Sequence, residues 1–203
     1  MEEKIETAVQ DRAGETRNRI IDAAQVIFSE KGYSHAGMRE IARHAGVATS
    51  LVTKYFGTKA SLFEAALTGA LIEVGIFQAD RSQFGERVVQ VTLDPEQRMS
   101  APAMIALSLG DAEARQVCIR VTREHIFKPM AQWLGEPHGL ERSINIFMMT
   151  LGLSIFGREV RDETAATADN ATGNELFARA LQAMVDLEHE AANSKSGIKP
   201  NVR

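Results

Sequence analysis

The segment of residues 38–59, MREIARHAGVATSLVTKYFGTK, has the spacing of two short helices that cross through a tight turn. Gly46 follows Ala42 by four residues, where a tight turn needs a positive φ without steric cost. The small Ala42 lets two steeply crossing helices come close, and Val52, ten residues later, faces back onto it from the second helix. With polar residues on the opposite face, this order of residues predicts a helix-turn-helix motif that contacts DNA.

The charge of the chain is unevenly distributed. Its net charge is −4, yet residues 12–60 carry eight Lys and Arg against four Asp and Glu, a local net charge of +4. Lys and Arg displace condensed counterions from DNA, so a basic segment on an acidic protein is what phosphate contact requires. Surface charge usually does no more than solvate a helix face. Because this positive segment coincides with the helix-turn-helix, it favours DNA binding.

Helical periodicity dominates the rest of the sequence, and no alternating strand pattern or internal repeat appears, so we predict an all-α fold. Gly32 and Gly57 are expected to end helices, and Thr58 to cap the next one. Besides the two helices of the motif, the predicted helices cover residues 15–31, 58–77, 86–93, 102–109, 111–134, 140–160 and 173–191. A break is predicted at residues 80–85 and a polar loop at 161–172.

The neighbours of the motif resemble the DNA-binding domain of the tetracycline-repressor (TetR) family. The resemblance runs from Thr16 to Leu67, about fifty of 203 residues. It rests on Ile20, Ala24, Ile27, Phe28, Gly32, Tyr33, Arg39, Glu40, Ile41, Ala42, Gly46, Val47, Tyr55, Phe56, Gly57, Lys59, Leu62 and Phe63. It implies an N-terminal three-helix helix-turn-helix DNA-binding domain, followed by a larger C-terminal helical domain that binds a ligand and dimerises.

The predicted DNA contacts come from the motif and its flanks. Small hydroxyls and a lysine near a helix N-terminus suit a major groove, where they meet base edges. The resemblance implies that the first motif helix contributes one contact, that the second reads bases, and that two residues hold backbone phosphates. In chain order these contacts are Arg39, Thr49, Ser50, Thr53, Lys54, Tyr55 and Lys59.

Two positions depart from the pattern of the family. The family usually has Tyr where Thr53 stands and a hydroxyl cap where Ala48 stands. Thr49 therefore either reads DNA or takes over as the helix cap. Tyr55 either holds a phosphate, as the resemblance implies, or packs against the first helix.

The second half of the chain carries two apolar helical stripes, over residues 140–160 and 173–191. They resemble the paired helices with which the family forms a two-fold four-helix dimer interface. The alternative is that the stripes fill the core of each subunit. The predicted interface residues are Met149, Gly152, Leu153, Phe156, Phe177, Leu181 and Met184. A homodimer is also favoured because one helix-turn-helix makes too few contacts for tight, specific binding to a palindromic operator.

Large, soft side chains scattered over the central helices are consistent with a cavity for an apolar or weakly polar effector. Ordinary core packing is the alternative for each of them. The predicted pocket residues are Phe77, Phe84, Met99, Met104, Ile105, Met130, Trp133 and Met149. By resemblance, binding of the effector would release a repressor from its operator.

Other classes of protein are disfavoured. Cys118 and His125 lie seven residues apart on one predicted helix, roughly 10 Å, which is too far for a nucleophile pair. The histidines show no metal-ligand spacing, so we expect no enzyme, metal or cofactor. The longest uncharged run, residues 143–157, is shorter than the roughly 20 residues that a membrane span needs. A helix-turn-helix scaffold acting through protein partners remains the alternative function.

We expect the chain to divide into a flexible arm (1–14), a DNA-binding domain (15–60), a regulatory and dimerisation domain (61–192) and a disordered tail (193–203). One cysteine excludes an intrachain disulfide and fits a reducing compartment. The acidic first residues do not resemble a signal peptide. These features favour a cytoplasmic protein.

Overall fold

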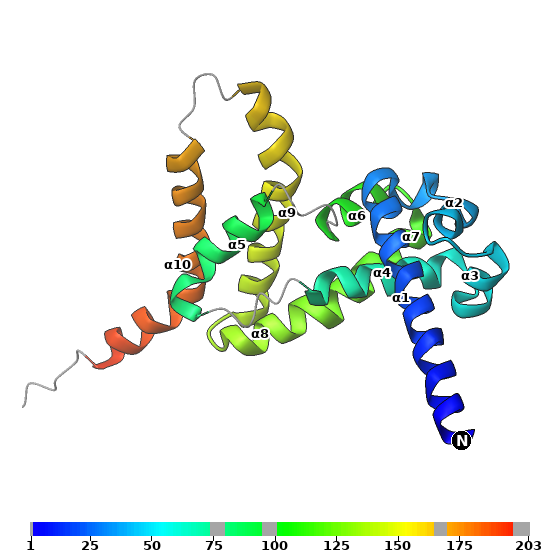
Figure 1. The fold of residues 1–203 in the computed structure, drawn as a ribbon. Helices are drawn as coiled ribbons and strands as arrows, with labels where there is room; N and C mark the ends of the chain where they lie inside the picture. The colour runs from blue at the N-terminus through cyan, green and yellow to red at the C-terminus, as the bar shows by residue number, and fades with distance from the viewer. Residues whose placement is uncertain (1, 74–79, 95–100, 165–169, 197–203) are drawn as a thin grey trace, which may run out of the picture. The chain divides into compact units, whose positions relative to one another are not determined.

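The computed structural model describes residues 2–73, 80–94, 101–164 and 170–196, with side chains for 12–72, 80–94, 101–155 and 171–187. Within these residues all regular structure is helical and no strand occurs (Figure 1), as the helical periodicity predicted. The chain forms two compact units, Met1–Glu73 with Arg98–Thr122 and Val74–Gln97 with Arg123–Arg203. No helix in the described part of the chain is both long and apolar enough to cross a membrane.

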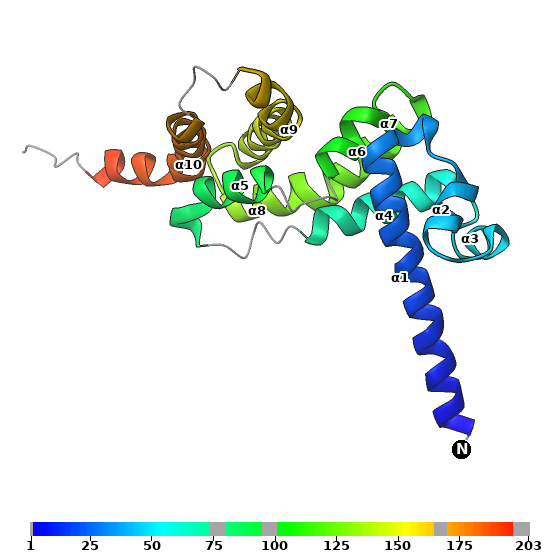
Figure 2. The ribbon, with the colours of Figure 1, turned by 45° about the horizontal axis from the view of Figure 1, so that its top comes forward.

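The first unit is built around its longest helix, α1, which lies against α2, α4 and α6 (Figures 1 and 2). Its helices are α1 (Glu2–His35), α2 (Met38–His44), α3 (Thr49–Phe56), α4 (Lys59–Glu73), α6 (Ala101–Ser108) and α7 (Ala112–Thr122). The segment predicted to end at residue 60 is therefore part of a larger compact unit, in which α4 packs against α7.

α1 begins at Glu2, so most of the segment that we predicted as a flexible arm is helical. The reason is local, because residues 2–13 are rich in Glu, Lys, Ala, Gln and Arg, which favour helices, and contain no Gly or Pro. Figure 2 shows this part of α1 extending beyond the other helices of the first unit. Gly32 interrupts α1 with a kink, because its φ of 68° and ψ of 176° are non-helical, but helical structure resumes after it as far as His35.

An aromatic cluster joins α1 to α4 in the core of the first unit. Phe63 packs edge-on against Phe28 and Tyr33, with ring centroids 4.9 and 5.3 Å apart. The buried Gln25 side chain adds a polar link, donating a hydrogen bond to the carbonyl of Ala66 at 3.1 Å. Burial of these rings fixes the start of α4 relative to the end of α1.

The second unit packs α5 against α9 and α10, and α8 against α9. Its elements are a 3₁₀ turn η2 (Arg81–Gln83), α5 (Phe84–Leu93), a π-helical turn η3 (Arg123–Phe127), α8 (Lys128–Leu134), α9 (Gly139–Thr164) and α10 (Asn170–Ser196). Gly85 lets α5 cross α10 closely, because a Cβ there would overlap the backbone of Ala178. Its N–H donates to the Gln182 side chain at 3.1 Å.

Several predicted helix boundaries differ from the structure. The break predicted at residues 80–85 is a single 3₁₀ turn, started by the Asp80 carboxylate accepting from the N–H of Ser82 at 3.0 Å. The predicted loop 161–172 is helical at both of its ends, because α9 continues to Thr164 and α10 begins at Asn170. α10 also continues past residue 193 to Ser196. Ala, Thr and Asn are polar or small, but they do not break a helix.

Candidate nucleic-acid interface

The helix-turn-helix has the geometry that its sequence predicts. Ile41, Ala42 and Val52 are buried between α2 and α3. Gly46 adopts φ +67°, and the N–H of Val47 donates to the carbonyl of Ala42 at 2.9 Å, closing the turn. The motif therefore presents the outer surface of α3 to solvent.

Four of the predicted contacts share one face of α3. Ser50, Thr53 and Lys54 are exposed, and Thr49 is half-buried beside them at helical spacing. The N-cap of α3 is Ala48, which offers no side-chain cap, and the Thr53 hydroxyl donates to the carbonyl of Thr49 at 3.3 Å. Thr49 is the first residue of α3 rather than its N-cap.

The remaining predicted contacts lie around that face. Arg39 is exposed on α2. Tyr55 is half-buried on a different side of α3 from Ser50, Thr53 and Lys54, with its ring centroid 6.3 Å from that of Phe56. Lys59 begins α4 and is also half-buried.

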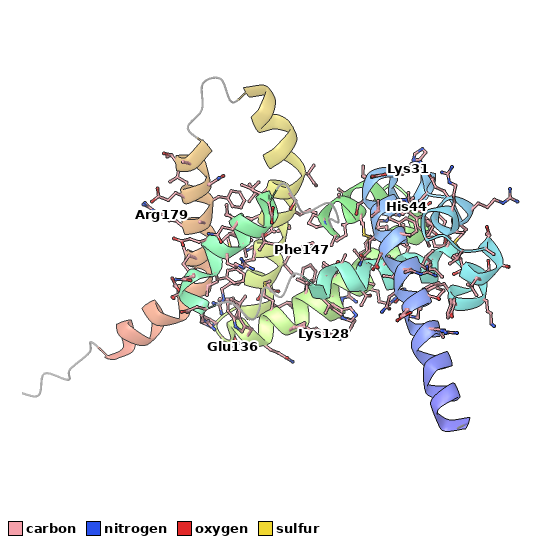
Figure 3. The ribbon with its side chains drawn as sticks, in the orientation of Figure 1. Lys31, His44, Lys128, Glu136, Phe147 and Arg179 are labelled. Atoms are coloured by element: carbon pink, nitrogen blue, oxygen red, sulfur yellow. The ribbon has the colours of Figure 1, made fainter. Side chains whose placement is uncertain are left out.

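Sequence reasoning did not single out Arg17, whose position only the tertiary structure reveals. Its guanidinium lies over the ring of Phe56, 5.3 Å from the centroid, and is exposed. Arg17 therefore adds a cation from α1 at the end of the recognition helix. On α1 as well, Lys31 (labelled in Figure 3) pairs with Glu40 of α2 at 2.6 Å, and this bond lowers the pKa of the Glu40 carboxyl.

The Lys59 ammonium is held by contacts with two residues near the end of α1. Its ammonium lies 4.5 Å from the centroid of the Tyr33 ring and donates to the Ser34 carbonyl at 3.5 Å. Burial lowers the pKa of Lys59, while the nearby carboxylates of Asp111 and Glu113 act in the opposite direction. These carboxylates favour the charged form of the ammonium.

The residues predicted to line an effector pocket fall into both compact units. Met104 and Ile105 are buried in the first unit. In the second unit, Phe84 packs against Trp133 with ring centroids 5.1 Å apart, and Met130 is also buried. Met149 is half-buried on α9, whereas the side chains of Phe77 and Met99 lie outside the described residues.

A groove of about 610 Å³ lies between α5 and α10 in the second unit, and the sequence did not predict it. Apolar residues of α5 and α10 form part of its wall, and polar and charged side chains form the rest. The lining residues include Glu86, Val89, Leu93, Asp94, Glu175, Ala178, Arg179 and Gln182. None of the six predicted pocket residues that the structure describes is among the groove's lining residues. Figure 3 labels Arg179, which pairs with Glu175 one turn earlier on α10.

The predicted interface residues occupy α9 and α10. Leu153 and Leu181 are buried within the chain, so they pack in its own core. The side chain of Phe156 lies outside the described residues. The others are half-buried: Met149, Gly152, Phe177 and Met184. Three further large apolar side chains of the two predicted stripes are exposed on these helices: Met148, Leu176 and Leu187.

Cys118 is buried, as expected for a small apolar residue, and burial raises the pKa of its thiol to about 11. A thiol with this pKa is not a nucleophile at neutral pH. No group of three or more potential metal ligands occurs among the described residues.

The architecture defines a helix-turn-helix regulator, and comparison with known proteins gives its family. Residues 20–66 match the family described as "Bacterial regulatory proteins, tetR family". Residues 82–185, more than half of the chain, match "Tetracyclin repressor-like, C-terminal domain". The chain therefore belongs to the TetR family, a family of transcriptional regulators rather than enzymes.

Individual relatives agree with this assignment. The chain is 38% identical over 71 residues to the HTH-type transcriptional regulator HbdR of Aromatoleum sp. (strain CIB), covering 34% of this chain and 31% of HbdR. The match thus spans about a third of that relative's length. The solved structure of NalD from Pseudomonas aeruginosa is 24% identical, with a TM-score of 0.56, 83% of this chain and 95% of NalD being covered. A TetR-family structure from Rhodococcus sp. is 18% identical, with a TM-score of 0.64 and coverage of 85% and 99%. These two structures share the fold.

Proposed function

We propose that this regulator acts in the cytoplasm as a homodimeric repressor, which binds a palindromic operator and leaves it when a small apolar or weakly polar effector binds. The observation that carries the proposal is the exposed face of α3, where Ser50, Thr53 and Lys54 stand clear of the core. A major groove admits such a helix, and small hydroxyls and a lysine suit its base edges.

Sequence-specific binding is tested by selecting DNA from a random pool, together with the DNA that flanks the protein's own gene. We expect a palindromic sequence to be enriched, with an affinity that falls steeply as salt rises, because several phosphates are contacted in each subunit. Equal retention of random and selected DNA would refute specific operator binding.

Dimerisation is supported by the exposed apolar side chains of α9 and α10. Met148, Leu176 and Leu187 are 56%, 60% and 45% exposed in the single chain, and large apolar side chains so exposed on adjacent helices mark an interface. Met148→Asp should therefore yield folded monomers by light scattering, because a dimer would bury an unpaired charge. The matched control is Ile119→Asp, which changes an exposed apolar residue of α7. A dimer that survives Met148→Asp would place the interface elsewhere.

Effector release is proposed from the family fold, and repression is the action stated for NalD, the secondary repressor of a multidrug efflux pump. α4 starts beside the recognition helix and carries the buried Leu67 and Leu71. A ligand that favours another tilt of α4 would move the recognition helices out of successive major grooves, roughly 34 Å apart.

Linkage makes the effector proposal testable. Apolar and weakly polar compounds are first screened by the shift that they cause in melting temperature, and hits are then titrated with and without operator DNA. We expect the operator to weaken effector binding by the same factor as the effector weakens operator binding. A compound that saturates the protein without changing its operator affinity is not the effector. If every compound that binds behaves in this way, the protein is a constitutive DNA binder.

A further inference from the structure

Lys59, a predicted phosphate contact, belongs to a cluster of residues that lie together in the first unit but are far apart in the sequence. The Tyr33 ring lies beneath the Lys59 ammonium. Tyr33 is held, through its backbone N–H and its phenol, by two residues near the turn between α6 and α7 (residues 109–111). The N–H of Tyr33 donates to the buried Ser108 hydroxyl at 3.0 Å, and its phenol donates to the Glu113 carboxylate at 2.5 Å. The ring that faces Lys59 thus depends on a segment 75 to 80 residues away.

The acidic side of this cluster is itself held in place. The Asp111 carboxylate accepts from the backbone N–H groups of Glu113 and Ala114 at 2.9 and 3.0 Å, which caps α7. Its second oxygen accepts from the Ser34 hydroxyl at 3.4 Å. Two carboxylates, those of Asp111 and Glu113, are therefore fixed within electrostatic reach of Lys59, as their effect on its pKa also indicates.

α1 and α6 are in close contact where Gly32 meets Leu107. Gly32 has φ +68°, and a Cβ there would lie 2.5 Å from the carbonyl oxygen of Leu107. The end of α6 is therefore packed directly against the backbone next to Tyr33, with no gap between them that could absorb a movement toward α1. Figures 1 and 2 both show the end of α1 beside α6.

We propose that Tyr33 and Glu113 are positioning residues that restrain Lys59, so that the α6–α7 turn sets how strongly this lysine holds a DNA phosphate. The inference rests on the proposed DNA-binding function. A cation is attracted to the face of an aromatic ring, and a phenol that donates to a carboxylate presents a more electron-rich ring. The ring and the two carboxylates compete with phosphate for the same ammonium, so moving the turn changes the affinity for DNA.

Two conservative variants separate the parts of the cluster. Tyr33→Phe keeps the ring in the aromatic core and removes the bond that holds Glu113. Glu113→Gln keeps an acceptor for the phenol and removes the charge. Each variant should strengthen binding of a DNA duplex about two- to fivefold at low salt, the size expected for a partly exposed charge interaction. The melting temperature of each variant shows whether it folds.

The same substitutions in a Lys59→Ala background show whether the effect runs through Lys59. We expect both gains to disappear there, because the ammonium on which they act is gone. Glu30→Gln is the charge-matched control, since it removes an exposed carboxylate from α1. Its small gain, from weaker general repulsion of DNA, should persist without Lys59.

The outcomes distinguish this inference from the proposed function. If the unmodified protein binds no duplex at any salt, DNA binding itself fails. If it binds, but Tyr33→Phe and Glu113→Gln leave the affinity unchanged or act equally without Lys59, only the restraint of Lys59 is overturned.

Discussion

Arg81 and Arg142 donate hydrogen bonds to the same acceptor, the carbonyl oxygen of Leu134, at 3.1 and 3.0 Å. Arg142 is buried, and its guanidinium also reaches the carbonyls of Gly135 at 2.6 Å and Met184 at 3.1 Å. The carbonyls at the end of α8 carry the negative end of the helix dipole, which favours a buried cation there. The two arginines thereby connect α8 with α10, since Arg81 also donates to the carbonyl of Val185 at 3.4 Å.

Arg142→Met should lower the free energy of unfolding by about 2–4 kcal/mol, because several buried carbonyls lose a charged donor. Arg142→Lys should not restore stability, since an ammonium lacks the planar fork that spans several acceptors. Chemical denaturation measures both variants. Arg179→Met is the matched control, because Arg179 is an exposed arginine of the same unit, and its change should stay within about 0.5 kcal/mol. An equal loss in the control would remove the special role of Arg142.

Gly32→Ala should destabilise the protein by about 2 kcal/mol or more, because a side chain at φ +68° is strained and would overlap the Leu107 carbonyl. Gly14→Ala, in the same helix, should act in the opposite direction. A Cβ at Gly14 meets no atom within 4 Å, and alanine favours a helix by roughly 0.5–1 kcal/mol. The melting temperature should therefore fall for Gly32→Ala and rise for Gly14→Ala. An unchanged melting temperature for Gly32→Ala would show that α1 and α6 can separate enough to accept the side chain.

Lys59→Ala and Lys54→Ala should weaken DNA binding in different ways. A phosphate contact carries no sequence information, so loss of Lys59 should weaken all duplexes alike and reduce the salt slope by about one. Lys54 lies on the exposed face of α3 that we propose contacts bases, so its loss should also change the preference among operators. Binding isotherms on an operator and a scrambled duplex, over a range of salt, test both. If Lys54→Ala leaves the operator preference unchanged, Lys54 does not contact the bases.

The pKa of Tyr33 is raised above its ordinary value of 10.0, first by burial and then by the hydrogen bond to Glu113 and the nearby carboxylates. A raised pKa in the folded state means that the neutral phenol stabilises the fold fully below pH 10 and that this stability is lost as the pH rises further. In a Tyr55→Phe background Tyr33 is the remaining tyrosine, because the chain has two. Its absorbance titration should move to lower pH in Glu113→Gln. If Tyr33 titrated at its ordinary pKa in the otherwise unmodified cluster, its burial and its partly buried hydrogen bond to Glu113 would be contradicted.

The sequence alone determined the motif and the helical class of the fold, though not every helix boundary, because these features depend on residues that are close along the chain. The spacing of Ala42, Gly46 and Val52 predicts the helix-turn-helix, and the structure gives Gly46 the positive φ that this spacing demands. Thr58 was expected to cap the fourth helix, and its hydroxyl accepts from the N–H of Ser61 at 3.1 Å. Gly32 was expected to end a helix, and it interrupts α1 with a kink. Helical period and capping are local properties, so a single sequence carries them.

Only the tertiary structure decided which distant residues meet. Nothing in the residues around Tyr33 indicates that Ser108 and Glu113 hold it, since these contacts join positions 75 and 80 residues apart. The predicted pocket residues show the same limit, because Met104 and Phe84 are equally apolar and buried yet belong to different compact units. Hydrophobic burial is not directional, so an apolar sequence pattern predicts that a side chain is buried but not which residues it packs against. Long-range hydrogen bonds and close backbone crossings, such as that of Gly85 on Ala178, supply that information.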